Sequence, residues 1–377
     1  LVIMLSFYLK GEIMQKTVAL GLSGGVDSAL AAWKLLQDGY RVIALTMSMW
    51  DGSVDMPVVE GRSGCFGPNE ALGIADAKKL ADRLGIEHVV VPVAKEFSEF
   101  VLEYFRGEYR SGRTPNPCVR CNQMIKFGAM LSVAKKMGID FDYFATGHYA
   151  RILDQGENFP ILWRAFDTFK DQSYFLSRLS RDTFSKVIFP LGEMKKENVK
   201  ALAEKMGWVE LSVKKESQDF LECGDYSVLF DERDNCPGNF VDTSGKVLGQ
   251  HRGIVHYTIG QRKGLNIGGQ KEPLFVSAID PKSNQVVLTP KSLLFSRKVF
   301  ARNVNLLVSE NSPLLHAPLL ARIRLGHAGA LAKIISLTPE CLEIEFETPQ
   351  FAATPGQIVV LYSEDGVVAS AIIEKAE

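Results

Sequence analysis

The 377 residues of this chain exceed what one hydrophobic core usually holds, so we expect two or three domains. Apolar residues make up 46% and charged residues 23% of the chain, which is ordinary for a soluble globular protein and argues against disorder. No apolar run reaches the roughly 18 residues of a membrane helix, and the first residues lack the basic lead and cleavage site of a secretory signal. We therefore expect a cytoplasmic protein with no membrane partner.

Short β-rich segments alternate with helical patterns between Lys16 and about Ala150. KTVALGL is followed by a helix from about Ser28, RVIALTMSMW by a helix over NEALGIADAKKLADRLG, and HVVVPV by a helix from about Lys95. Strands that alternate with helices indicate a parallel sheet with crossover helices. We therefore expect an α/β fold of Rossmann-like type, with an ATP-binding catalytic domain over residues 14–211.

The pattern changes after about Leu211, where the sequence becomes rich in glycine and turns. A small central domain, which links the two larger ones and binds nucleic acid, is expected over residues 212–281. From about Pro281 onward short strands follow one another closely. Their spacing predicts a C-terminal β-barrel domain over residues 282–377.

A basic stretch lies in the central domain, although the net charge of the whole chain is only −1. Between Gly245 and Lys271 there are five Lys or Arg residues and no Asp or Glu. A local basic face of this kind suits nucleic-acid phosphates, and the same composition also fits a solvated glycine-rich turn. The candidate phosphate contacts are Lys246, Arg252, Arg262 and Lys263.

A glycine-rich loop, Gly21-Leu22-Ser23-Gly24-Gly25-Val26-Asp27-Ser28, lies between the first predicted strand and helix. The adjacent glycines let backbone N–H groups approach a phosphate, the serines add hydroxyl donors, and the helix N-terminus adds partial positive charge. The loop is not a Walker motif and resembles the SGGxDS loop of the PP-loop ATP pyrophosphatases. Asp27 is expected to assist Mg²⁺ or to cap the helix. The plainer alternative is an ordinary strand-to-helix turn with Asp27 as its N-cap.

The other candidate site contains two cysteines, Cys118 and Cys121, in the segment TPNPCVRCN. Six cysteines in a cytoplasmic chain favour thiol chemistry or metal binding over a disulfide framework. We expect the next helix to begin near Asn122, which places the thiols at its N-terminus beside Arg120. That environment predicts a lowered thiol pKa, with Cys121 the better-placed nucleophile. Half of a zinc site and a buried pair of structural thiols are the alternatives.

Several motifs in a fixed order carry a resemblance to a known family. They are GLSGGVDS, TPNPxxxCNxxIKFG from Thr114, ATGHYAR from Ala145, KDQSYFL from Lys170, ESQD from Glu216, HxGxxxxTIGQRKGL from His251 and TPGQ from Thr354. From Lys16 onward the sequence resembles the tRNA-specific 2-thiouridylases, which thiolate the wobble uridine of certain tRNAs. The resemblance implies a PP-loop ATP pyrophosphatase domain, a central domain and a C-terminal β-barrel.

The resemblance also implies roles for individual residues. The ATP contacts would be Gly21 to Ser28, Met47 and Gly147, and the nucleophile would be Cys121. The contacts to the target base and the tRNA would be Asn116, Pro117, Cys118, His148, Lys170, Asp171, Gln172, Arg324, Leu325 and Gln357. At Arg324-Leu325 the family has an Arg-Tyr pair, so only the arginine is retained. Without the motif, His148 is equally well a structural histidine at a strand end, and Lys170–Gln172 a solvated charged turn.

Two departures from the family pattern concern the cysteines. Cys118 stands where most members carry Asp. The family's SQ[DE]xC motif, whose cysteine carries the persulfide sulfur, here reads Ser217-Gln218-Asp219-Phe220-Leu221, and a cysteine follows only at Cys223. Three alternatives stay open: Cys223 carries the sulfur from a shifted position, the Cys118/Cys121 pair acts alone, or Cys118, Cys121 and Cys223 bind a [4Fe-4S] cluster.

The function implied by the resemblance is a tRNA-uridine 2-sulfurtransferase that uses ATP and Mg²⁺. The uridine C2 oxygen would be adenylated and then replaced by sulfur from a persulfide or a cluster-bound sulfide. The expected partners are the tRNA anticodon loop and a sulfur-donor protein, and we expect a monomer. A different PP-loop ligase, or a non-catalytic RNA-binding module, is the alternative.

Overall fold

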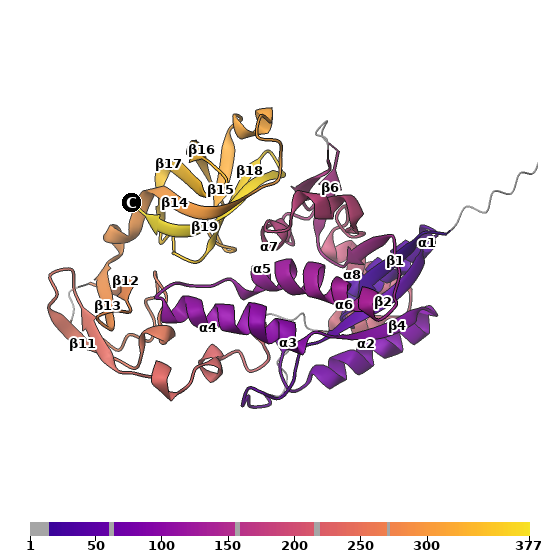
Figure 1. Cartoon of the computed structure of the whole chain (residues 1–377), viewed down its shortest axis with the longest axis horizontal. Helices are drawn as coiled ribbons and strands as arrows, with labels where there is room; N and C mark the ends of the chain where they lie inside the picture. The colour runs from indigo at the N-terminus through magenta and orange to yellow at the C-terminus, as the bar shows by residue number, and fades with distance from the viewer. Residues whose placement is uncertain (1–14, 60–63, 155–158, 215–218, 270–271) are drawn as a thin grey trace, which may run out of the picture.

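The computed structural model describes residues 15–59, 64–154, 159–214, 219–269 and 272–377. A parallel sheet with its helices occupies one end of the molecule, a pair of long helices crosses the middle, and a β-barrel lies above them (Figure 1). The small central sheet lies at the opposite end from the parallel sheet (Figure 1). Met14, Glu216 to Gln218 and Lys271 fall outside the described residues. None of the described helices is long and apolar enough to cross a membrane.

The parallel sheet confirms the α/β prediction. Within the described residues its strand order is β4-β2-β1-β5-β8, and every neighbouring pair is parallel. The strands are β1 (Thr17–Gly21), β2 (Arg41–Ser48), β4 (Glu87–Pro92), β5 (Tyr143–Thr146) and β8 (Val187–Ile188). Such an order brings the carboxyl ends of β1, β2 and β5 to one edge, where ligands bind in folds of this type.

Alternate strand residues face two separate cores, as the period of two in a β-strand requires. Val18 and Leu20 pack with one helical layer, and Ala19 packs with the other. The first layer comprises α1 (Val26–Gln37), α2 (Glu70–Leu84), α8 (Lys196–Lys205) and α9 (Val209–Val213). The second comprises two long composite helices, α3 (Ala94–Phe97) with η1 (Ser98–Leu102) and α4 (Glu103–Arg110), and α5 (Pro117–Cys121) with η2 (Asn122–Ala129) and α6 (Met130–Lys136).

The second composite helix begins at Pro117, five residues before the predicted start. Asn116 caps it, because its side-chain oxygen accepts a hydrogen bond from the Val119 N–H at 3.1 Å. An asparagine N-cap followed by proline at the first helical position is a favoured helix start. A short parallel pair, β3 (Gly64–Phe66) and β9 (Asp219–Leu221), lies beside this helical layer.

The central sheet has strand order β11-β10-β13-β12. Its strands are β10 (Gly238–Val241), β11 (Val247–His251), β12 (Leu274–Asp280) and β13 (Gln285–Pro290). Phe240, Tyr257 and Leu288 belong to its small core. The remaining short helices are α7 (Ser173–Leu176), η3 (Arg181–Lys186), η4 (Tyr226–Leu229), η5 (Glu232–Asp234), η6 (Ile254–His256), η7 (Lys291–Leu294) and η8 (Pro313–Leu315).

The C-terminal strands form the predicted barrel. Their order is β14-β17-β16-β15-β18-β19, and β14 also pairs with β19, which closes the sheet on itself. The strands are β14 (Phe295–Leu306), β15 (Leu319–Arg322), β16 (Ala330–Leu337), β17 (Cys341–Phe351), β18 (Ile358–Ser363) and β19 (Gly366–Ala376). A hairpin of β6 (Ala150–Leu153) and β7 (Ile161–Arg164) joins the sheet at β19.

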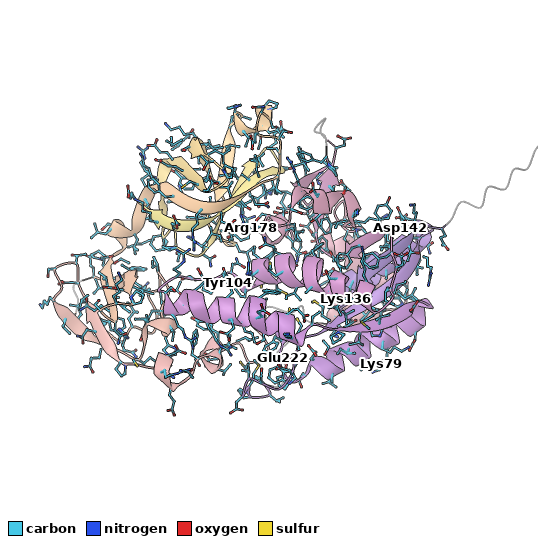
Figure 2. All side chains as sticks on the ribbon, in the orientation of Figure 1. Lys79, Tyr104, Lys136, Asp142, Arg178 and Glu222 are labelled. Atoms are coloured by element: carbon cyan, nitrogen blue, oxygen red, sulfur yellow. The ribbon has the colours of Figure 1, made fainter. Side chains whose placement is uncertain are left out.

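The barrel is fixed to the catalytic part of the chain by buried polar contacts. Arg178 donates to the Ser370 carbonyl at 2.9 Å, and the Asn305 side chain donates to the carbonyls of Ser177 and Leu179 at 2.9 and 2.8 Å. Figure 2 shows Arg178 between the helices and the barrel. These bonds hold the barrel over the second helical layer.

Candidate active site

The glycine-rich loop is shaped by backbone constraints. The Leu22 N–H donates to the Leu45 carbonyl at 2.9 Å, which holds the loop on the end of β2. Gly24 has a φ of +71°, and a Cβ there would lie 3.1 Å from the backbone nitrogen of Ala77. A side chain at this position would be strained twice, by the left-handed backbone and by the contact with α2. Gly25 is the N-cap of α1.

The two loop serines bond to one another across the turn. The Ser23 N–H donates to the Ser28 hydroxyl oxygen at 3.2 Å, and the two hydroxyl oxygens lie 3.3 Å apart. Ser28 is buried and donates to the Gly25 carbonyl at 3.0 Å, whereas Ser23 is exposed. The loop therefore presents an accessible hydroxyl in front of the N-terminus of α1, an arrangement that suits an anion.

Asp27 is not the N-cap of α1, so that expectation was wrong. Gly25 takes the N-cap position, and the Asp27 carboxylate turns to α8 instead. Both of its oxygens lie 2.7 Å from the ammonium of Lys196, which is buried, and Tyr149 donates its hydroxyl to one of them at 2.8 Å. The geometry ties the nucleotide loop to α8.

Met47 and Gly147 lie at the carboxyl ends of β2 and β5, as the strand pattern predicts. A Cβ on Gly147 would lie 2.9 Å from both the Asp27 carbonyl carbon and the Ser28 nitrogen. Only glycine allows β5 to approach α1 this closely. The fold thus brings the glycine-rich loop and Gly147 into direct contact, with Met47 half-buried on the neighbouring strand.

The thiols of Cys118 and Cys121 lie within the first turns of the second composite helix. Arg120 points away from them, because its side chain donates to the Phe100 carbonyl at 3.0 Å and lies 5.2 Å from the centre of the Tyr104 ring. Figure 2 shows Tyr104 between α4 and the chain that leads into α5. Arg120 therefore does not activate either thiol.

The prediction of lowered thiol pKa values was wrong. Burial raises the pKa of Cys118 to about 12 and that of Cys121 to about 11. Desolvation disfavours the thiolate more than the start of the helix favours it, because both thiols pack against the core of the second helical layer. Lys126 opposes the shift and lowers the pKa of both thiols.

This protonation state predicts slow alkylation of Cys121 near neutral pH. Since its pKa is raised to about 11, the thiolate fraction grows about tenfold per pH unit up to that value. We expect the iodoacetamide rate at Cys121, followed by peptide mass spectrometry, to rise steadily between about pH 7 and pH 10. Exposed Cys341 is the internal reference, and Lys126→Ala should slow Cys121 further. A Cys121 rate that levels off below pH 9 contradicts the raised pKa.

Cys223 follows β9 and is buried, 7% exposed. Its thiol lies 3.3 Å from the Asp225 carbonyl oxygen, as a donor. Among the described residues, no group of three or more His, Cys, Asp or Glu side chains is arranged to hold a metal ion. Cys118, Cys121 and Cys223 therefore do not fit the ligand set of a [4Fe-4S] cluster in this arrangement.

Three family descriptions match successive parts of the chain. They are a tRNA methyl transferase HUP domain over residues 16–223, a tRNA methyl transferase PRC-barrel domain over 227–290 and an aminomethyltransferase beta-barrel domain over 296–373. A 4-thiouridine synthetase solved in complex with RNA and ATP is 18% identical, covers 53% of this chain and 43% of that chain, and gives a TM-score of 0.32. That similarity is too low to bear on this chain.

Full-length relatives are much more similar. The tRNA-specific 2-thiouridylase MnmA of Endomicrobium trichonymphae is 45% identical over 94% of this chain and 98% of the relative. Those of Lachnoclostridium phytofermentans and Magnetococcus marinus are 40% and 41% identical, over 96% and 93% of this chain and 100% and 97% of the relatives. This chain belongs to the tRNA-specific 2-thiouridylase family. Its membership confirms the resemblance.

In this 2-thiouridylase family member, His148 follows Gly147 at the end of β5. Its Nδ1 lies 2.7 Å from the Thr146 hydroxyl oxygen, and its ring packs against those of Phe127 and Phe189, which also contact each other. Burial, helped by the charge of Lys126, holds the pKa of His148 well below its usual value. The imidazole is therefore neutral at physiological pH.

Lys170, Asp171 and Gln172 do not form a solvated turn. The Asp171 carboxylate is 1% exposed, lies 3.5 Å from both Arg164 and Arg322, and accepts hydrogen bonds from Ala165 and Ser173. The Gln172 side-chain oxygen accepts from the Tyr149 N–H at 2.9 Å. In the free protein Gln172 therefore holds the backbone at Tyr149, and Asp171 holds the backbone at Ala165 and the barrel residue Arg322.

Gln357 reaches from the barrel to the loop before the cysteines. Its amide donates to the carbonyls of Thr114 and Pro115 at 3.1 and 3.0 Å, next to Asn116 and Pro117. Arg324 donates to the Phe351 carbonyl at 2.9 Å, while Leu325 is exposed. The four basic residues of the central domain, Lys246, Arg252, Arg262 and Lys263, are also exposed.

Sequence reasoning gave no role to Lys126, although it lies in the IKFG part of a quoted motif. Its charge lowers the pKa of Cys118, Cys121 and His148, and also that of a thiol on another strand, Cys65. Lys126 is thus the cation common to the thiols and the histidine beside the nucleotide loop. A lysine five residues after Cys121 on the same predicted helix was the available signal.

Proposed function

We propose that this chain thiolates the wobble uridine of tRNA at C2, with ATP cleaved to AMP and pyrophosphate. The observation that carries the proposal is that the helix of Cys121 reaches the end of β5: the ring of Phe127 on η2 lies 6.1 Å from the ring of His148. Lys126 precedes Phe127 on this helix. Its charge acts on Cys118 and Cys121 and also on His148, which adjoins Gly147 and so the nucleotide loop. A site that activates a uridine oxygen with ATP and then delivers sulfur needs the nucleotide loop and the cysteines within reach of the same base.

In the first step the uridine O2 attacks the α-phosphate of ATP, and pyrophosphate leaves. The resulting O2-adenylate makes C2 electrophilic and AMP a good leaving group. The proposed ATP contacts are Gly21, Leu22, Ser23, Gly24, Gly25, Val26, Asp27, Ser28, Met47 and Gly147. Mg²⁺ bound with the nucleotide neutralises phosphate charge. Because Asp27 is paired with Lys196, its contribution to binding Mg²⁺ depends on how far that pair opens.

In the second step a sulfur-bearing thiol attacks C2, AMP leaves, and a second thiol releases the product by forming a disulfide. Cys121, Cys118 and Cys223 are the catalytic candidates that the sequence provides. Since the described thiols do not fit a cluster, the proposed transfer uses a cysteine persulfide. A neutral His148 beside the site suits a base-contacting role better than a phosphate contact.

The proposed tRNA surface runs from the central domain to the barrel. Exposed Lys246, Arg252, Arg262 and Lys263 would contact phosphates, and the target base would be flipped out of the anticodon loop towards Asn116 and Cys118. His148, Lys170, Arg324, Leu325 and Gln357 complete the proposed contacts. We propose a cytoplasmic monomer that receives sulfur from a donor protein, with domains at 14–211, 212–281 and 282–377.

The direct test is incubation of the protein with ATP, Mg²⁺, an unmodified tRNA transcript and a persulfide-donating cysteine desulfurase. We expect 2-thiouridine at the wobble position, detected by nucleoside mass spectrometry, with one AMP formed per thiolated tRNA. Absence of 2-thiouridine overturns the proposal. AMP formation with a different product would instead indicate another PP-loop ligase, and tRNA binding without AMP a non-catalytic module.

Gly147→Ala should weaken the use of ATP. The added Cβ would lie 2.9 Å from backbone atoms of Asp27 and Ser28 and would push α1 and its loop aside. An overpacked contact of this kind costs roughly 1–3 kcal/mol, so we expect the KM for ATP to rise roughly tenfold or more. Gly73→Ala on α2 is the matched control, because a Cβ there meets nothing within 4 Å. Equal ATP kinetics for both variants would contradict this role of Gly147.

A further inference from the structure

The nucleotide loop carries no positive side chain of its own. Gly21 to Ser28 contain no Lys or Arg, and their one charged residue is the acidic Asp27. ATP brings several negative charges, which the loop N–H groups, the Ser23 hydroxyl and the N-terminus of α1 offset only in part. Walker loops meet the same need with a lysine inside the motif. Apart from Mg²⁺, a cation for the phosphates must therefore come from another part of the chain.

Lys196 contacts the loop but is committed to Asp27. Its ammonium lies 2.7 Å from both carboxylate oxygens, and its side chain is 7% exposed. The two charges of this pair offset each other. Lys196 therefore holds the loop on α8 and leaves the phosphate charge to another group.

Lys214 reaches the loop from the end of α9. It is the C-cap residue of that helix, which Arg83 of α2 holds through an ion pair with Glu210 at 2.8 Å. The Lys214 ammonium donates to the Gly24 carbonyl at 3.3 Å. Gly24 directly follows Ser23, the residue with the accessible hydroxyl. Lys214 thus brings a positive charge to the loop residue next to that donor.

The carboxylate that now pairs with Lys214 can be exchanged for another anion. The Lys214 ammonium lies 2.9 Å from one oxygen of Asp76 on α2, and the two side chains are 40% and 45% exposed. Exposed ion pairs of this kind contribute little to stability, so exchanging one for another costs little. The other Asp76 oxygen lies 3.8 Å from Lys79, which Figure 2 shows on α2, and this pair remains when Lys214 leaves.

Asp76 also packs directly against the loop. A Cβ on Gly24 would lie 3.2 Å from the Asp76 Cβ and 3.1 Å from the Ala77 nitrogen. The carboxylate that holds Lys214 therefore belongs to a residue that touches the nucleotide loop. A phosphate bound in the loop and Asp76 would compete for one ammonium, within the reach of the flexible lysine side chain.

The helical layer that carries Lys214 indicates which phosphates it meets. α2 and α9 belong to the first layer, whereas Cys118 and Cys121 pack in the second. The α-phosphate has to face the uridine, and so the cysteines, for sulfur to displace AMP. The position of Lys214 on the first layer therefore suits the β- and γ-phosphates.

We propose that Lys214 binds the phosphates of ATP that leave as pyrophosphate, and that its ammonium exchanges Asp76 for them when the nucleotide binds. This inference rests on the proposed function. The ammonium suits a phosphate because it is a compact positive charge with three donors. It offsets the negative charge that develops on the leaving pyrophosphate.

Isothermal titration calorimetry with separate parts of the nucleotide tests the assignment. The ligands are pyrophosphate with Mg²⁺, AMP, and α,β-methylene-ATP, which the proposed reaction cannot cleave. We expect Lys214→Met to raise the Kd for pyrophosphate and for the ATP analogue about tenfold or more, and to leave the Kd for AMP near that of the wild type. Lys214→Arg, which retains the charge, should bind pyrophosphate more tightly than Lys214→Met. Unchanged pyrophosphate affinity in Lys214→Met, or an equal loss of affinity for AMP, overturns the assignment.

Two further variants separate a phosphate contact from a structural link to α2. Asp76→Asn removes the competing carboxylate and should tighten pyrophosphate binding roughly two- to fivefold. If Lys214 serves only to hold Asp76, then Asp76→Asn weakens binding as Lys214→Met does, which overturns the inference. Lys79→Met is the matched control, because it removes the other lysine beside Asp76 and should leave the Kd for pyrophosphate near that of the wild type.

Failure of the proposed function gives a different result. Wild-type protein that binds none of the three ligands overturns the use of ATP and, with it, this inference. Pyrophosphate binding that depends on Lys214, in a protein that forms no 2-thiouridine, contradicts the thiolation and supports the phosphate contact.

Discussion

Cys121→Ser is expected to stop the release of 2-thiouridine, by about a thousandfold or more, while one tRNA-dependent equivalent of AMP per enzyme still forms. The serine hydroxyl occupies nearly the same volume as the thiol but cannot form the disulfide that frees the product. The reaction halts after AMP leaves, with tRNA joined to the protein through a C2–S–S bond to the cysteine that carried the sulfur. The adduct should appear on a non-reducing gel and disappear with dithiothreitol.

Two comparisons make this result specific. Cys121→Ser incubated without a persulfide donor should form no adduct, because the sulfur that attaches the tRNA is absent. Cys118→Ser tests the neighbouring thiol: an adduct that accumulates in Cys118→Ser and not in Cys121→Ser would transfer the resolving role to Cys118. Loss of AMP formation in Cys121→Ser would contradict the separation between adenylation and sulfur transfer.

The fold could be predicted from the sequence where its signals are local. Each strand of the parallel sheet is a short apolar run, and its alternate residues, such as Val18 and Ala19, fill two different cores. The closely spaced C-terminal strands likewise indicated a barrel. The β6–β7 hairpin was not predictable as part of the barrel sheet, because its pairing at Gly366 joins residues about 200 positions apart in the chain and has no local signal.

The nucleotide loop was also a local prediction, and Gly24 and Gly147 occupy positions where a Cβ would collide with neighbouring backbone. The prediction of lowered thiol pKa values failed because the pKa of a thiol depends on its burial in the tertiary structure. Here the effect of burial is larger than the effect of the helix start. The error in the helix start was avoidable, since Asn116-Pro117 is itself a capping signal.

Replacing Asp171 with alanine should destabilise the protein by about 3 kcal/mol or more. Its carboxylate is 1% exposed and faces Arg164 and Arg322, and it accepts hydrogen bonds from the Ala165 and Ser173 N–H groups. Removal of one partner from a buried ion pair leaves the other charges and donors without compensation, at a cost of about 3–5 kcal/mol. The lower end applies because Arg164 also pairs with Asp365, and Arg322 donates to the His327 carbonyl.

Asp365→Ala is the matched control, because Asp365 pairs with the same Arg164 at 3.6 Å but is 44% exposed. Surface ion pairs contribute at most about 1 kcal/mol, so urea unfolding should separate the two variants clearly. If Asp171 acts only through the fold, the tRNA affinity of its folded fraction should stay near that of the wild type. A stable Asp171→Ala protein with strongly weakened tRNA binding would instead make Asp171 a direct contact and would require the loop around it to open when tRNA binds.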